Sequence, residues 1–161
     1  MSDGDESSWQ AALIDRLASG PGRVAAAARR AGIPAGGEWS ALQVVRHLVA
    51  TESLVWQARL EQLEASAGAE GRQLSPPTWV WLEPGPWSGP GDDTIEGTIA
   101  ELRRRRVRTL ELVRRLDAAG WRRFGIHATY GRLDVGRLLT VAVDHDAEHL
   151  GQIEALIPGQ G

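Results

Sequence analysis

Four segments of this chain repeat apolar residues at intervals of about 3.6 residues, which places them on one face of an α-helix. The segments span about residues 8–32, 40–66, 93–119 and 134–157. A helix with one apolar face has to bury that face against another element, and no segment shows the alternation of a strand. The pattern therefore predicts an all-α protein, a four-helix bundle with a long connection between its second and third helices.

Capping and breaking residues predict where these helices begin and end. Ser7, Ser40 and Asp134 are placed as N-caps, and each of the two serines has a glutamine three residues later, as in a capping box. The Gly-Pro-Gly sequence at 20–22 is expected to break or kink the first helix, because proline lacks an N–H group. Gly120 is expected to end the third helix.

The composition excludes several classes of protein. The 161 residues suit one domain, which we place at residues 8–161 after a disordered acidic N-terminus of residues 1–7. The 21 acidic residues outnumber the 18 basic ones, and a net charge of −3 argues against a nucleic-acid partner. No apolar run approaches the roughly 20 residues of a membrane span, and no secretory signal is visible, so a cytoplasmic protein is expected.

Three histidines fall on the inward faces of predicted helices. Because the chain has no cysteine, any metal has to be held by His, Asp or Glu. His145 and His149 lie one turn apart on the last helix, which alone is weak evidence. His47 lies on the apolar face of the second helix, and bundle cores bring such faces together. The three together predict a metal site with open positions, as in catalytic centres.

Other polar residues are weaker candidates for this site. Gln152 stays on the inward side of the last helix, and Glu148 could act as a base, although a solvated side chain is the simpler interpretation. HDAEH at 145–149 also matches the H-x-x-E-H pattern of inverted zinc proteases, which we set aside because the third candidate ligand lies upstream. His127, in the linker before the last helix, could support the pocket or simply hold the linker in place.

Two further features concern packing. Arg106 lies on the apolar face of the third helix, and because a buried arginine needs a carboxylate, we expect a structural pair with Glu52 of the second helix.

The connection at residues 67–92 is rich in Gly, Pro and Ser, and long connections of this kind are often functional. Its tryptophans either anchor it to the bundle or line the mouth of a substrate pocket. They are Trp79, Trp81 and Trp87.

Several stretches, taken in order, resemble one known family. WSALQVVRHL, the arginine and leucine pattern of the third helix, HATYG and HDAEHLGQI look like the DinB/YfiT-like metalloenzyme superfamily over about residues 10–157. The resemblance implies a four-helix bundle with a long connection between helices two and three, often a homodimer. It also implies a divalent metal held by one histidine of the second helix and two of the fourth, which correspond to His47, His145 and His149.

The resemblance also implies an activity. Characterised members include thiol S-transferases and an isomerase that use low-molecular-weight thiols such as bacillithiol or mycothiol. We therefore expect a metal-dependent S-transferase acting on a small thiol and an electrophile. A Lewis-acidic metal can deprotonate water as well as a thiol, so a hydrolase stays open, as does a non-catalytic metal- or ligand-binding bundle. Imidazole suits several metals: zinc or nickel is expected first, with iron or manganese as alternatives.

Overall fold

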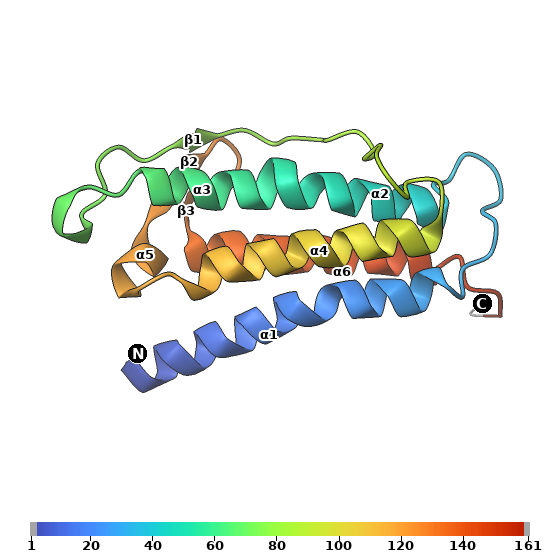
Figure 1. Ribbon diagram of the computed structural model, residues 1–161, viewed down its shortest axis with the longest axis horizontal. Coiled ribbons are helices and arrows are strands. Elements are labelled where there is room, and N and C mark those ends of the chain that lie inside the picture. The colour runs from blue at the N-terminus through green and yellow to red at the C-terminus, as the bar shows by residue number, and fades with distance from the viewer. Residues whose placement is uncertain (1–2, 160–161) are drawn as a thin grey trace.

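The computed structural model describes residues 3–159, which form a bundle of four long helical segments (Figure 1). The first is α1 (Asp3–Ala28), and the second combines three consecutive elements described below. The third and fourth are α4 (Ile95–Arg114) and α6 (Val135–Glu154). The predicted four-helix bundle is confirmed, and the long connection lies between its second and third segments (Figure 1).

The second segment changes its winding partway along. Ser40 caps it in the predicted capping box: its Oγ accepts the Gln43 N–H at 3.2 Å, and its own N–H donates to Gln43 Oε1 at 2.8 Å. The segment then passes from α2 (Ala41–Thr51) through the π-helix η1 (Glu52–Gln57) into α3 (Ala58–Ala65). Its extent agrees with the prediction, whereas the π-helical winding, which is rare and often found at functional sites, was not predicted.

α1 runs in one piece through the Gly-Pro-Gly sequence, so of the two expected outcomes, a break or a kink, the break is wrong. Pro21 has no N–H to donate, and in an α-helix its partner would be the carbonyl of Leu17. That carbonyl instead accepts a hydrogen bond from Arg106 Nη1 at 2.6 Å. A side chain from another helix therefore replaces the missing bond.

α1 also begins earlier than predicted. It starts at Asp3, so Ser7 is not its cap, and residues 3–7 are helical instead of forming a disordered tail. Acidic side chains in the first turns interact favourably with the positive end of the helix dipole, which the prediction did not weigh. Residues 1–2, the rest of that predicted tail, lie outside the described residues, as do residues 160–161.

The chain between α4 and α6 is more structured than a plain linker. α4 ends at Arg114, not near Ala119 as predicted. A short helix, α5 (Ala118–Arg122), follows, and its cap Asp117 accepts the N–H of Gly120 at 2.7 Å. Gly120 therefore lies inside a helix instead of ending one. A local cap was enough to restart the helix around this glycine.

A small three-stranded sheet joins the long connection to the start of α6. β1 (Thr78–Trp79) pairs in parallel with β2 (Phe124–His127), which pairs antiparallel with β3 (Gly131–Asp134). The prediction of no strand is wrong, because strands of two to four residues are too short to display alternation. The predicted N-cap Asp134 is confirmed, since its side chain accepts the N–H of Arg137 at 2.9 Å.

Two apolar clusters fill the bundle and leave a polar layer between them. Along α6 one cluster ends at Val143 and the other begins at Leu150; along α4 they are separated between Leu102 and Leu110. The intervening residues include most of the buried polar side chains described next. Among residues 3–159, no helix is long and apolar enough to cross a membrane.

Candidate metal centre

The three histidines predicted from separate helices come together in this polar layer. His47 comes from α2, and His145 and His149 come from α6; all three are buried. Nε2 of His145 lies 3.4 Å from Nε2 of His47 and 3.1 Å from Nε2 of His149. One nitrogen of each ring lies within 4.8 Å of the others, so a single ion could contact all three.

Hydrogen bonds at the outer nitrogens orient two of these rings. His47 Nδ1 lies 3.2 Å from the carbonyl oxygen of Pro84, and His149 Nδ1 lies 2.9 Å from Oε1 of Gln152. A carbonyl or amide oxygen only accepts, so in the neutral ring each Nδ1 carries the proton and each Nε2 presents a lone pair. Oxygens that hold the outer nitrogen in this way are typical supports of metal-binding histidines.

His145 cannot satisfy both of its neighbours by hydrogen bonding. A proton on its Nε2 can serve only one of the two facing lone pairs. Its Nδ1 is buried without a hydrogen-bond partner among the described residues. Such a group of nitrogens makes a poor hydrogen-bonded cluster, whereas it matches the donor set of a divalent transition metal.

Burial favours the neutral form of two of these rings, those of His47 and His145. It lowers the pKa of His145 to about 3, with the neighbouring imidazoles and the Arg106 guanidinium acting in the same direction. Burial also lowers the pKa of His47, and His149 lowers it further. Because metals bind the neutral ring, His47 and His145 are in the binding form at neutral pH.

The three histidines line a cavity of about 550 Å³. Gln152, Glu148 and Trp81, all candidates from the sequence, line the same cavity. So does Trp39, whose ring centroid lies 5.5 Å from that of His47. Trp39 was not predicted from the sequence; the available signal was its position directly before the Ser40 cap, eight residues before His47.

The other two tryptophans of the long connection anchor it to the bundle. Trp79 is buried, and its Nε1 donates to Oε1 of Gln62 at 2.6 Å. The main chain of Trp87 makes two hydrogen bonds with Arg46: its N–H donates to the Arg46 carbonyl at 3.1 Å, and its carbonyl accepts from Arg46 Nε at 2.7 Å. Trp81 thus lines the cavity, as one interpretation predicted, whereas Trp79 and Trp87 anchor the connection to the bundle, as the other predicted.

His127 is not among the residues that line the cavity. It is buried, and its Nδ1 accepts the backbone N–H groups of Thr129 at 3.0 Å and of Tyr130 at 3.3 Å. Its ring centroid lies 4.8 Å from that of Tyr130. These contacts hold the turn between β2 and β3, which corresponds to the structural interpretation of this residue.

A buried ionic network lies beside the histidines. Arg106 donates from Nε and Nη2 to the two carboxylate oxygens of Glu52, each at 2.8 Å, so the structure brings the expected pair together. Its Nη2 also donates to Oδ2 of Asp146 at 2.8 Å, and the Thr109 hydroxyl donates to Glu52. Asp146 was not predicted as a partner, because one carboxylate, Glu52, is enough to balance the charge of a buried arginine.

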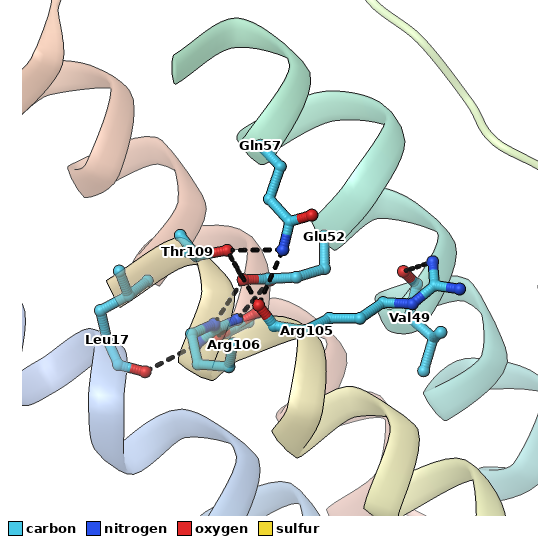
Figure 2. Close-up of polar contacts among 8 residues, drawn as sticks. Leu17, Val49, Glu52, Gln57, Arg105, Arg106 and Thr109 are labelled. Atoms are coloured by element: carbon cyan, nitrogen blue, oxygen red, sulfur yellow. Dashed lines mark hydrogen bonds and ion pairs between the residues drawn. The ribbon is translucent and has the colours of Figure 1, made fainter. Parts of the chain in front are cut away.

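Figure 2 shows Arg106 of α4 bonded to Glu52 and to the Leu17 carbonyl. Through Asp146 the network also reaches α6. Glu52 opens η1, five residues after His47, while Asp146 directly follows His145. Burial lowers the pKa of Arg106, but the two carboxylates outweigh it and hold that pKa above its usual range. The permanently charged guanidinium therefore fixes η1 and α6 relative to each other, and with them the two segments that carry the three histidines.

Comparisons with known proteins agree with this architecture. A family model described as the DinB superfamily matches residues 10–153. Among solved structures, the chain is similar to YfiT from Bacillus subtilis, described as a probable metal-dependent hydrolase with an unusual four-helix bundle topology. The two are 19% identical with a TM-score of 0.66, covering 97% of this chain and 87% of that one, a likeness that establishes a common fold alone. No curated protein is significantly similar to the chain.

Proposed function

This chain belongs to the DinB superfamily, and we propose that it is a divalent-metal-dependent enzyme with His47, His145 and His149 as its metal ligands. The observation that supports this most strongly is the convergence of their Nε2 atoms. A bound divalent cation supplies a Lewis acid at which a small nucleophile loses its proton. Three protein ligands leave room for that nucleophile, as in catalytic centres.

The proposed reaction is the transfer of a low-molecular-weight thiol, such as mycothiol or bacillithiol, to a small electrophile. Pro84 and Gln152 hold two of the ligand rings in orientation, and the cavity of about 550 Å³ is large enough for small-molecule ligands. Glu148, which lines the cavity next to His149, is our candidate to receive the proton that the thiol releases.

A hydrolase is the second candidate. It would use the same histidines with water as the nucleophile, and the description of YfiT, a protein of the same fold, as a probable metal-dependent hydrolase supports it. Zinc and nickel are the metals that we propose first, with iron or manganese as alternatives. From the family resemblance we also propose a homodimer, which light scattering on the purified protein would test.

Elemental analysis tests the metal site directly. Protein purified without chelator should contain about one divalent ion per chain, and His47→Ala should lose it. His127→Ala is the matched control, because this buried histidine lies outside the cavity and should leave the metal content unchanged. If the wild type carries no metal and His47→Ala leaves the affinity for added metal unaltered, the proposed site is wrong.

A second experiment separates the two activities. The metal-loaded and chelated proteins are incubated with small electrophiles, with and without added thiols. Metal-dependent loss of free thiol together with the electrophile indicates a transferase, whereas metal-dependent cleavage without thiol indicates a hydrolase. If metal binds but no reaction depends on it across the panel, the chain is a metal-binding bundle and both enzyme proposals fail.

A further inference from the structure

The walls of the metal-site cavity are acidic. Besides the three histidines, the ionisable residues that line it are Glu38, Glu83 and Glu148. No arginine lines this cavity in the described part of the chain, although all 18 basic residues of the sequence are arginine. Apart from the histidines, the ionisable side chains that line the cavity are therefore all acidic.

Neighbouring arginines are engaged elsewhere. Arg46, adjacent to His47 in the sequence, bonds to the carbonyl of Trp87 and lies 3.6 Å from the Asp92 carboxylate. In α4, Arg105 pairs with Glu101 of its own helix. The arginine-rich third helix thus supplies no positive charge to the cavity wall, and an anionic substrate would find no cationic side chain there.

With a divalent ion bound, the summed formal charge of the groups that line the cavity stays negative. The three cavity carboxylates carry three negative charges, whereas a divalent ion brings two positive ones. Imidazoles that bind a metal are neutral and add no charge, and transfer of a proton from the nucleophile to Glu148 leaves the sum unchanged. Because like charges repel, a substrate carboxylate that lies against these exposed glutamates is disfavoured, most strongly at low ionic strength.

Two tryptophans complete the cavity wall. Trp81 donates from Nε1 to Oε1 of Glu83 at 2.6 Å, which holds an indole and a carboxylate side by side. Trp39 lines the cavity beside His47. Trp39 is 45% exposed and Trp81 41% exposed, so neither residue is fully covered by the protein. Aromatic faces with carboxylates nearby are the usual environment for binding an ammonium group.

We propose that this cavity selects a substrate bearing a positively charged amino or ammonium group and discriminates against substrates bearing carboxylates or sulfonates. The inference rests on the proposed function, because it concerns a substrate of the same site. Of the two thiols named above, it favours mycothiol, which carries no carboxylate, over bacillithiol, whose malate group carries two, and it favours a cationic electrophile over an anionic one.

Three probes with one carbon skeleton test the charge preference: phenethyltrimethylammonium, 2-phenylethanol and 2-phenylethanesulfonate. The sulfonate is chosen because it is a weak metal ligand. Binding is measured by calorimetry at about 20 mM and about 200 mM NaCl. At low salt the cation should bind at least about tenfold more tightly than the sulfonate, with the alcohol between them, and added salt should reduce the difference. Equal affinities, tighter sulfonate binding or no binding of the cation would overturn the proposal.

Matched variants assign the preference to the cavity. The triple variant Glu38→Gln, Glu83→Gln, Glu148→Gln should lose the preference for the cation over the sulfonate. A control triple variant has the same change of net charge at exposed glutamates that do not line the cavity, and should keep it; its sites are Glu64, Glu70 and Glu111. Persistence of the preference in the first variant, or its loss in the second, would also contradict the proposal.

The same titrations on chelated protein separate this inference from the proposed function. Removing a divalent ion takes away two positive charges, so the preference for the cation should increase. If the protein holds no metal but still prefers the cation, the metal proposal fails and the charge selectivity stands. If metal binds through His47 but the sulfonate binds with the same affinity as the cation, the metal site stands and the proposed charge selectivity is wrong.

Discussion

Arg106 donates a hydrogen bond to the main-chain carbonyl of Leu17 at 2.6 Å. That carbonyl would bond to the N–H of the residue four positions later, but this residue is Pro21, which has none. The same guanidinium pairs with Glu52 and Asp146. One buried side chain of α4 therefore satisfies a backbone carbonyl of α1 and pairs with carboxylates of η1 and α6.

Replacing Arg106 by methionine should lower the free energy of unfolding by about 3–5 kcal/mol, because Glu52 and Asp146 would remain buried without a counter-charge. Urea denaturation at neutral pH measures the change. Arg104→Met is the control: its side chain is exposed and bonds to Glu101 of its own helix, so its cost should be about 0–1 kcal/mol. Similar costs for the two variants would contradict a special role for the buried network.

The two glycines that flank Pro21 should respond in opposite directions to alanine. A Cβ at Gly20 would lie 2.7 Å from Oδ2 of Asp146 and 3.1 Å from Nη1 of Arg106, whereas a Cβ at Gly22 meets nothing within 4 Å. Gly20→Ala should therefore cost about 1–3 kcal/mol by disturbing a buried ion pair. Gly22→Ala should stabilise α1 by about 0.5–1 kcal/mol through helix propensity. Thermal denaturation of both variants measures the two changes in stability. If both variants are stabilised or both are destabilised, the prediction is wrong.

The sequence was sufficient to predict the bundle and the grouping of the histidines. His145 and His149 are spaced by one helical turn, and the apolar period of α2 turns His47 inward, so both features are local. The Gly-Pro-Gly sequence misled the prediction because the donor that replaces the missing N–H comes from Arg106, a distant residue. The three strands were missed because they are too short to show a period.

Asp146 shows why the rest of the site could not be predicted. It lies one position after His145, so it points about 100° away from that ring around α6. It reaches Arg106 only because Gly20 of α1 leaves room beside the ion pair. Likewise, the support of His47 by the Pro84 carbonyl depends on the path of a long connection that has no periodic pattern. Both contacts depend on how distant segments pack.

Gln152→Ala should weaken metal binding by about 10–100-fold without removing any ligand, because Oε1 of Gln152 orients His149 through its Nδ1 at 2.9 Å. Gln152→Glu, which keeps an acceptor oxygen, should retain most of the affinity. Competition with a chelator measures both. Glu154→Ala is the control, since this exposed residue lies on the same helix and does not line the cavity. An effect of Glu154→Ala as large as that of Gln152→Ala would contradict the proposed support.

The metal-free protein should lose stability as the pH falls from about 6.5 to about 5. Burial holds the pKa of His145 at about 3 and lowers that of His47, whereas an unfolded histidine titrates near 6.5. Below that value the unfolded chain takes up protons that the folded protein does not, so the free energy of unfolding decreases with falling pH. His145 alone should account for about 2 kcal/mol of the loss by about pH 5.

Comparison with His145→Gln isolates this contribution. Asp146 acts in the opposite direction, because burial raises its pKa and the folded state gains stability wherever that carboxyl takes up a proton before the unfolded chain does. The variant keeps Asp146 and loses the titrating ring, so its denaturation midpoint should fall less steeply between neutral pH and about pH 5. Parallel curves for wild type and variant would mean that His145 is not held neutral by the fold.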